Sequence, residues 1–315
     1  MKFSIGIPAY KASFLKECID SILAQIYPDF ELIIVNDASP ENIKEIVLQY
    51  SDPRISYYEN EKNTGAENVV DNWNKCLAFA RGDYFILMGD DDKMAPEYLD
   101  TFVSLINRHP QLNVFHCRAY IINENSKIIS ITPSRPEIES VYDSILQRMR
   151  HNRSFYISDY VYKTEELKHS GGFYKLPLAW ASDDISAYIA SLKYGIAHTE
   201  KPVFLYRRSS ITISATGNFK LKIDAIIKEE QWLTDFLSII PDKEIDKVLR
   251  DEIKKELKKY IQKKKIGILS LSFIKSKKSY IKSMFIRKQF ELSFLEVNYA
   301  LFNSIVEIKK NKRFN

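Results

Sequence analysis

The first ninety residues alternate short apolar runs with stretches of helical spacing, and this alternation constrains the fold more than any other feature of the chain. Apolar residues recur every three to four positions in 13–27, 41–50 and 69–80, which indicates amphipathic helices. Strands that alternate with helices through short polar loops are typical of βαβ units. The sequence therefore predicts an α/β fold, with a mainly parallel mixed sheet flanked by helices. The four apolar runs are residues 3–7, 32–35, 55–58 and 84–88.

Three polar segments directly follow three of these runs. Pro8, Ala9 and Tyr10 follow the first, residues 36–39 the second, and residues 89–92 the fourth. Open α/β sheets bind ligands beyond the carboxyl ends of their strands. We therefore expect the three segments to share one cleft.

The segment after the fourth run holds three consecutive acidic residues, Asp90, Asp91 and Asp92. Adjacent carboxylates at the end of a buried strand repel each other and lose hydration, so a cation beside them is stabilising. Oxygen ligands of this kind suit Mg²⁺ or Mn²⁺, which keep waters and bridge to substrate phosphates. The alternative is a plain turn whose first Asp caps a helix that starts near Pro96. Both interpretations stay open on these residues alone.

Two further turns allow both a binding and a purely local interpretation. Asp37 lies in a polar turn after a strand, where a carboxylate could accept the imide N–H of a uracil or thymine ring. Asp is also common in turns for local reasons. Asn63 and Gly65 form a similar turn, and the same alternative applies to them.

The second half of the chain contains an acidic pair and a basic pair. Asp183 and Asp184 begin a stretch of helical spacing that ends at Gly195. They fit either a helix N-terminus or a general base positioned for an acceptor hydroxyl. Arg207 and Arg208 lie in a loop that could hold diphosphate oxygens, although a solvated charged loop is the commoner explanation.

Charge is distributed unevenly along the chain. The net charge is +5, yet residues 254–288 hold thirteen Lys or Arg and one acidic residue, so this segment carries +12 and the rest −7. A basic segment of this kind predicts an anionic surface as its partner. The apolar run 266–274 within it suggests a helix lying in the headgroup plane of a membrane, and Phe285, Phe290, Phe294 and Leu295 add further large apolar groups. No recognised motif supports nucleic-acid binding, so we expect no nucleic-acid partner.

Cysteine usage and the N-terminal run indicate the compartment. Cys18, Cys76 and Cys117 are odd in number and far apart, which predicts buried, reduced thiols. The first apolar run is too short for a signal peptide, and no stretch approaches the roughly 18 apolar residues of a spanning helix. We expect a cytoplasmic protein that is peripheral on the inner face of the cell membrane.

Strand-like segments cease near residue 217, which predicts domains 1–217 and 218–315, the second helical and Lys-rich.

Read in order, these segments resemble the inverting glycosyltransferases of family 2, which have the Rossmann-like GT-A fold. The resemblance covers about residues 3–214, roughly two thirds of the chain. Gly89 stands where many members have Asp, and Ser209 stands where a His often follows the Tyr-Arg-x segment. The segments that carry the resemblance are Ile7-Pro8-Ala9-Tyr10, Val35-Asn36-Asp37-Ala38-Ser39, Asn63-Thr64-Gly65, Asn72-Trp73-Asn74, Ala80-Arg81-Gly82-Asp83-Tyr84, Gly89-Asp90-Asp91-Asp92 and Gly171-Gly172-Phe173 followed by Asp183-Asp184.

The resemblance implies a role for each candidate residue. Asp37 would read the nucleobase, and Asp184 would be the catalytic base. Asp92 and Asp90 would bind Mn²⁺ or Mg²⁺. The residues that would contact the nucleotide sugar are Pro8, Ala9, Tyr10, Asp37, Asn63, Gly65, Asp90, Asp91 and Arg207.

The implied activity is sugar transfer with inversion, from a nucleotide-diphosphate sugar to a saccharide or lipid-linked acceptor in surface polysaccharide biosynthesis. UDP- or dTDP-sugars are favoured as donors, and GDP-sugars stay open. One alternative is a membrane-associated adaptor that binds nucleotide sugars without catalysis. Another is a sugar nucleotidyltransferase, which would be expected to carry a glycine-rich and basic triphosphate loop near its N-terminus. Residues 2–16 contain only Gly6 and no such loop.

Overall fold

The computed structural model describes residues 1–209 and 218–311. Contacts between residues divide the chain into two compact units, and each is described by itself. The first comprises Met1–Lys175 and Ser182–Thr212, and the second Leu176–Ala181 and Ile213–Asn315. The domain boundary expected at residue 217 falls outside the described residues, and the limits 1–217 and 218–315 stay a prediction.

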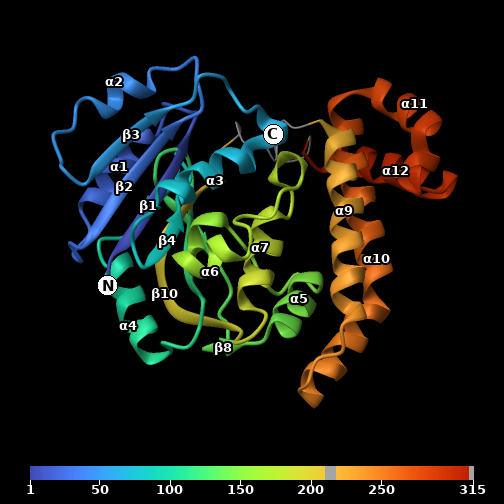
Figure 1. The fold of residues 1–315 in the computed structure, drawn as a ribbon. Helices are drawn as coiled ribbons and strands as arrows, with labels where there is room; N and C mark the ends of the chain where they lie inside the picture. The colour runs from blue at the N-terminus through green and yellow to red at the C-terminus, as the bar shows by residue number, and fades with distance from the viewer. Residues whose placement is uncertain (210–217, 312–315) are drawn as a thin grey trace. The chain divides into compact units, whose positions relative to one another are not determined.

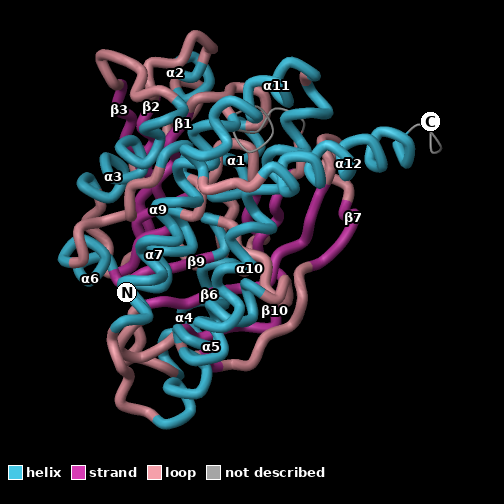
Figure 2. Tube along the Cα trace, turned by 90° about the vertical axis from the view of Figure 1, so that its right-hand side faces the viewer, coloured by secondary structure: helices cyan, strands magenta, loops and turns pink. Residues whose placement is uncertain are grey.

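The first unit is built on one mixed sheet, which has ten strands in the described part of the chain (Figures 1 and 2). The strands are β1 (Phe3–Ala9), β2 (Phe30–Asn36), β3 (Ile55–Glu59), β4 (Tyr84–Leu87), β5 (Lys93–Met94), β6 (Val114–Ile122), β7 (Ile128–Ile131), β8 (Ile138–Glu139), β9 (Tyr160–Lys163) and β10 (Ile196–Arg207). Their order is β3-β2-β1-β4-β9-β6-β10-β5, with β7 beside β6 and β8 beside β10. The four strands β1 to β4 run parallel, β6 pairs parallel with β10, and β9 is antiparallel between β4 and β6. The expected α/β fold with a mainly parallel mixed sheet is confirmed.

Helices of the first unit follow the apolar periodicity of the sequence. They are α1 (Leu15–Leu23), α2 (Ile43–Val47), α3 (Val69–Phe79), α4 (Tyr98–Arg108), α5 (Val141–Met149), α6 (Thr164–His169) and α7 (Ser182–Ser191), with the 3₁₀ turns η1 (Ala66–Asn68) and η2 (Ile157–Asp159). The helix expected to continue to Ile26 is shorter, because α1 ends at Leu23 and Ile26 is 67% exposed. Pro28 cannot continue a helix, which explains the early end.

The core of the first unit surrounds β1. Phe3, Ile5, Ile7 and Ala9 are all fully buried. Strands of a parallel sheet are covered on both faces, so a central strand reads as a continuous apolar run. Within the described residues the three cysteines are free and buried, as the sequence predicts.

The second unit is helical. It contains the 3₁₀ turn η3 (Pro177–Ala179), α9 (Phe219–Ser238), α10 (Glu244–Lys275), α11 (Lys277–Ile286), η4 (Arg287–Phe290) and α12 (Phe294–Asn311). α10 packs along α9 and also contacts α11 and α12 (Figure 1). This confirms the predicted helical C-terminal region. Among the residues described, no helix combines the length and the apolar character needed to cross a membrane.

Part of the basic segment is internal to the second unit. Lys265 is fully buried and lies 3.3 Å from a Glu230 carboxylate oxygen and 3.2 Å from one of Glu291. Leu269 and Phe273 are 1% and 4% exposed. The run 266–274, which the sequence suggested as the membrane-contacting segment, therefore contributes side chains to the core of this unit, because α10 is covered by neighbouring helices.

Candidate active site

The loops after β1, β2 and β4 are joined by hydrogen bonds at the carboxyl ends of these strands. The backbone N–H groups of Tyr10 and Lys11 donate to Asp90 Oδ2 over 2.9 and 2.7 Å. Ser39 Oγ donates to the carbonyl of Tyr10 over 2.6 Å. Because β1 lies between β2 and β4, its loop contacts both neighbours. The structure thus brings together the three polar segments that follow these strands.

Asp37 is buried and held by the loop that precedes α3. Its Oδ1 accepts hydrogen bonds from Asn60 Nδ2 at 2.7 Å and from the Thr64 backbone at 3.0 Å, and its Oδ2 accepts one from the Thr64 hydroxyl at 2.6 Å. Asn63 Nδ2 donates to the carbonyl of Asp37 over 2.8 Å. Gly65 has a φ of 77°, a left-handed conformation that favours glycine. A carboxylate accepts about four hydrogen bonds, so Asp37 retains room for one donor from a ligand.

The ammonium group of Lys11 lies beside the first two carboxylates of the acidic triplet. Lys11 Nζ is 2.5 Å from Asp91 Oδ2 and 3.5 Å from Asp90 Oδ1. Burial raises the pKa of Asp90, although the charge of Lys11 opposes this rise. Burial also disfavours the charged form of Lys11, but the two carboxylates outweigh it and its pKa is raised. A lysine therefore supplies positive charge where the sequence predicts a cation.

Asp92 is held from two other elements of the sheet. The backbone N–H of Arg207 in β10 donates to Asp92 Oδ1 over 2.8 Å, and Ser158 Oγ in η2 lies 3.4 Å from Asp92 Oδ2. Burial raises the pKa of Asp92 well above its ordinary value, and the neighbouring charge of Asp91 adds to the effect. The triplet is thus fixed at both ends, Asp90 by the loop after β1 and Asp92 by β10.

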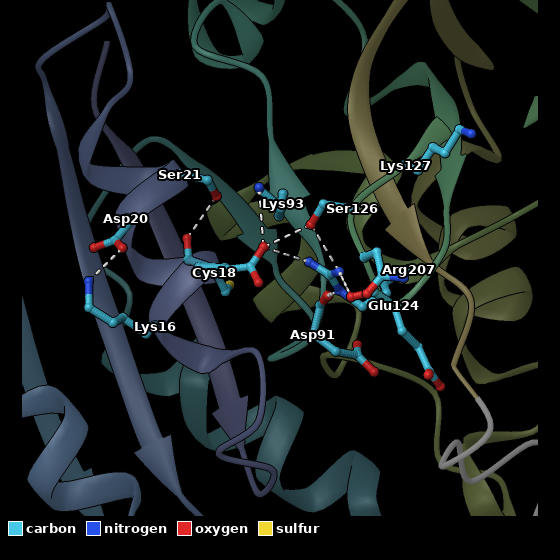
Figure 3. Close-up of polar contacts among 12 residues, drawn as sticks. Lys16, Cys18, Asp20, Ser21, Asp91, Lys93, Glu124, Ser126, Lys127 and Arg207 are labelled. Carbon is cyan, nitrogen blue, oxygen red and sulfur yellow. Dashed lines mark hydrogen bonds and ion pairs between the residues drawn. The ribbon is translucent and has the colours of Figure 1, made fainter. Parts of the chain in front are cut away.

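Arg207 braces the triplet from within the protein. Its side chain lies beside Asp91 and Ser126 (Figure 3) and the residue is 1% exposed. Arg207 Nε donates to the carbonyl of Asp91 over 2.7 Å, and a terminal nitrogen donates to the Glu17 carboxylate over 3.0 Å. The sequence predicted contact with diphosphate oxygens here. The side chain is buried because Arg207 belongs to strand β10 and not to the expected loop, whereas Arg208 is exposed.

Because Gly89 has no side chain, the carboxylate of Asp92 can lie close to its main chain. A Cβ atom at this position would lie 2.7 Å from Asp92 Oδ2, closer than real contacts allow. The absence of a side chain at position 89 is therefore coupled to the orientation of the Asp92 carboxylate.

Asp183 and Asp184 lie in the first turn of α7. Asp184 is 3% exposed, and its Oδ2 is 3.2 Å from Arg148 Nε of α5. Its Oδ1 is buried and has no hydrogen-bond partner among the described residues. Burial, together with the charge of Asp184, raises the pKa of Asp183 to about 7, although Arg148 opposes this. The pair therefore offers an acceptor oxygen and a carboxyl that titrates near neutral pH.

The turn η2 connects the acidic pair with the triplet. Ser158 contacts Asp92, and the next residue, Asp159, interacts electrostatically with Asp183. Burial raises the pKa of Asp159, and the charge of Asp183 adds to this rise. The acidic triplet and the pair Asp183–Asp184, which are about ninety residues apart in the sequence, thus both interact with the turn η2.

The donor set of the triplet fits a divalent ion bound jointly with a nucleotide. In residues 1–209 and 218–311, no three His, Cys, Asp or Glu side chains form a group that could hold a metal ion. Mg²⁺ typically uses one or two carboxylates together with substrate phosphates and water, so a complete protein cage is not required. The ammonium group of Lys11 already places one positive charge beside Asp90 and Asp91.

Sequence reasoning missed three residues of this region. Lys11 directly follows the Pro8–Tyr10 segment, and a basic residue next to a segment expected to contact the nucleotide was the available signal. Ser158 and Arg148 lie 66 and 36 positions from the carboxylates that they contact. Only the folded chain brings them there.

The chain belongs to glycosyl transferase family 2, whose family model matches residues 4–211. The family resemblance is thereby confirmed. Membership in this family argues against the sugar nucleotidyltransferase alternative.

Curated relatives share part of the chain. The Escherichia coli protein WcaA, which carries the name of a colanic acid biosynthesis glycosyl transferase, is 35% identical over 120 residues, covering 37% of this chain and 40% of WcaA. Glycosyltransferase GlyA of Streptococcus pneumoniae is 27% identical over 177 residues, covering 53% of this chain and 22% of GlyA. The chain therefore spans two fifths or less of the length of these relatives.

Solved structures share the fold over nearly the whole chain. The structure of S. aureus TarS 1-349 in complex with UDP-GlcNAc has a TM-score of 0.66 and 18% identity, covering 97% of this chain and 88% of that one. The Pyrobaculum calidifontis mannosyltransferase PcManGT in complex with GDP-Man and Mn²⁺ has a TM-score of 0.56 and 16% identity, covering 99% and 82%. The expected GT-A architecture is confirmed.

Proposed function

We propose that this enzyme transfers a sugar from a nucleoside diphosphate sugar to a hydroxyl group of a saccharide or lipid-linked acceptor, with inversion at the anomeric carbon. The observation that carries the proposal is the meeting of the loops after β1, β2 and β4 around Asp37, Lys11 and the acidic triplet. The nucleotide sugars named for the two similar solved structures support a donor of this class.

The donor would bind along these loops. Asp37 would accept an N–H of the nucleobase, which favours uracil or thymine and also admits guanine. Pro8, Ala9 and Tyr10 would contact the nucleotide from the end of β1, and Asn63 and Gly65 shape the loop that holds Asp37. Asp90 and Asp91 would face the ribose and diphosphate.

A divalent ion, Mn²⁺ or Mg²⁺, would be held by Asp92 and Asp90. When bound, it would supply positive charge that stabilises the departing diphosphate. Arg207 fixes the main chain of Asp91 and, through its own backbone, the carboxylate of Asp92. We therefore propose Arg207 as a residue that positions the triplet.

Asp184 would act as the catalytic base. It would take the proton of the acceptor hydroxyl while that oxygen forms a bond to the anomeric carbon, and the electron pair of the breaking bond would leave with the diphosphate. Attack from the face opposite the leaving group inverts the configuration in one step. The partner-free Oδ1 of Asp184 is suited to receive the proton, and Arg148 orients the carboxylate through Oδ2.

We propose residues 1–217 as the catalytic domain and residues 218–315 as a helical region that contacts an anionic membrane surface. The name of WcaA supports a role in surface polysaccharide synthesis. The enzyme would then work in the cytoplasm, peripheral on the inner face of the cell membrane, where lipid-linked acceptors are presented.

A nucleotide-sugar panel tests the proposal. Purified protein with Mn²⁺ is titrated with UDP-, dTDP- and GDP-sugars, and binding and slow donor hydrolysis are recorded with and without excess chelator. We expect one nucleotide class to bind, and its metal-dependent affinity to weaken on Asp92→Ala. Equal binding of all nucleotide classes would contradict the assignment of Asp37 as the residue that reads the nucleobase. Unchanged donor hydrolysis in excess chelator would contradict the assignment of Asp90 and Asp92 as metal ligands.

A further inference from the structure

Two helices of the second unit expose large apolar side chains beside lysines. On α11, Lys278, Ile281, Lys282 and Phe285 are spaced i, i+3, i+4 and i+7, so they share one helix face. Ile281 is 60% and Phe285 85% exposed. A phenylalanine that is exposed to this degree loses the stabilisation that burial provides, which points to a surface that becomes covered.

α12 continues this pattern. Leu295, Tyr299 and Phe302 are spaced i, i+4 and i+7 and are 77%, 57% and 62% exposed. Val297 and Ala300 of the same helix are fully buried. The helix therefore turns small and medium apolar groups toward its own unit and its largest ones away from it. We call Lys278, Ile281, Lys282, Phe285, Leu295, Tyr299 and Phe302 the α11–α12 surface.

The two helices are anchored, so the exposed side chains do not result from a loose end. The Tyr280 ring packs edge-on against Phe273 of α10 with 5.6 Å between the ring centroids. Its hydroxyl donates to Asn298 Oδ1 of α12 over 3.0 Å. Ser270 of α10 donates to the carbonyl of Ala300 over 3.0 Å. These contacts fix the inner faces of α11 and α12 and leave the outer ones to a partner.

The charge on α11 and on the turn η4 has one sign, whereas α12 carries Glu296 next to Leu295. Residues 275–290 contain six Lys or Arg and no Asp or Glu. Lys278, Lys282 and Lys288 are exposed, and the described residues form no ion pair with them. By contrast, the first half of α10 mixes both signs, as the pair between Lys255 and Glu252 shows.

From this combination we propose that the α11–α12 surface docks on an anionic lipid surface, with its apolar side chains entering the headgroup layer and its lysines beside lipid phosphates. This inference rests on the peripheral membrane location in the proposed function. It narrows the expected contact to the α11–α12 surface, because Leu269 and Phe273 of the run 266–274 are buried. A second copy of the chain fits less well, because a symmetric pairing would bring Lys278 and Lys282 against their own copies.

Vesicle sedimentation with the full chain tests the proposal without using activity. We expect binding to vesicles of phosphatidylglycerol and phosphatidylcholine, weaker binding in high salt, and little binding to pure phosphatidylcholine. The double variant Phe285→Ser/Leu295→Ser should lower the partition coefficient at least tenfold. Lys278→Gln/Lys282→Gln should lower it about fivefold per lysine, which corresponds to about 1 kcal/mol each. All four side chains are exposed, so folding is expected to persist, and a melting curve verifies this.

Matched controls come from the same unit. Ile239 and Ile240 are 60% and 67% exposed, and Ile239→Ser/Ile240→Ser should leave vesicle binding unchanged. Lys258→Gln/Lys259→Gln removes two exposed lysines from α10 and should have little effect. Equal losses in test and control variants would overturn the proposal in favour of diffuse charge attraction. A dimer in light scattering that Phe285→Ser/Leu295→Ser dissociates would overturn it in favour of a second copy. Failure of vesicle binding with intact donor binding would leave the transferase assignment standing.

Discussion

Lys11 Nζ lies 2.5 Å from Asp91 Oδ2 and 3.5 Å from Asp90 Oδ1, so an ammonium group occupies the edge of the acidic triplet where a divalent ion would add its charge. The lysine stabilises three neighbouring carboxylates that would otherwise repel each other. It also opposes a second cation at the same oxygens. The affinity for a divalent ion in the absence of nucleotide should therefore be lowered by the charge of Lys11.

Replacing Lys11 should strengthen binding of Mn²⁺ alone. Lys11→Gln removes the competing charge, and for a partly exposed pair worth about 1 kcal/mol we expect about fivefold tighter binding in a Mn²⁺ titration followed by electron paramagnetic resonance. Lys16→Gln is the control, because Lys16 pairs with Asp20 on the exposed side of α1. Unchanged or weaker Mn²⁺ binding in Lys11→Gln would show that the lysine does not shield the metal ligands.

A methyl group at position 89 should disturb the triplet. Gly89→Ala places a Cβ atom 2.7 Å from Asp92 Oδ2, so Asp92 must move and metal-dependent donor affinity should fall at least tenfold. Gly267→Ala is the matched control, since a Cβ there meets nothing within 4 Å inside α10. It should raise stability by about 0.5–1 kcal/mol because glycine is unfavourable within a helix. Calorimetric titration with the donor measures the affinity of both variants, and urea unfolding measures their stability. A donor affinity that Gly89→Ala leaves unchanged would contradict the prediction.

Asp184→Asn should remove catalysis and spare binding. Asn keeps the size of the side chain but cannot take the acceptor proton, so turnover with acceptor should fall at least a hundredfold while donor affinity is retained. The neighbouring Asp183→Asn should cost less. A variant that melts early yet keeps full turnover per folded molecule would assign Asp184 to helix architecture instead.

Asp183→Asn should stabilise the protein at alkaline pH. The folded pKa of about 7 lies above the ordinary value of 3.8, so the folded state binds more protons in this range and loses stability as pH rises from about 4 to 7. Removing the carboxyl should therefore raise the melting temperature at pH 8, by about 2–4 °C for each kcal/mol gained in the free energy of unfolding. The gain near pH 5 should be smaller. An equal change at both pH values would mean that Asp183 does not titrate near neutrality.

Acid should destabilise the first unit through the buried pair of His198 and Glu139. His198 Nε2 lies 3.4 Å from Glu139 Oε2. Burial lowers the pKa of His198 to about 4. Burial favours the neutral form of Glu139, but contacts from His198 and Arg153 outweigh it and lower its pKa to about 2.

For His198 the unfolded state binds a proton near pH 6.5 and the folded state only near 4, so stability is lost as pH falls across this window. For Glu139 the loss follows as pH falls from 4.5 to about 2. His198→Gln should flatten the dependence of the unfolding free energy between pH 6.5 and 4, an effect of about 3 kcal/mol in urea unfolding. A dependence of undiminished size in this variant would place its origin in other groups.

The alternation of four strands and three helices in the first ninety residues could be predicted from the sequence, as could the place of Asp37 and the triplet after the ends of strands. Apolar periodicity is a local property, and the carboxyl ends of parallel strands meet at one edge whatever the side chains are. Local spacing could not predict which oxygen meets which donor. Arg207 looked like an exposed phosphate ligand, but β10 extends far enough to bury it against Asp91.

The sequence by itself determined the family, the α/β architecture and the basic character of the C-terminal region, because all three depend on residue type and spacing. Only the tertiary structure decided that Lys11 neutralises Asp91 and that Arg148 holds Asp184. It also decided that Phe285 and Leu295 face outward while Leu269 and Phe273 face inward. Burial depends on which elements pack together, and a run of apolar residues carries no information about which of its sides will be covered.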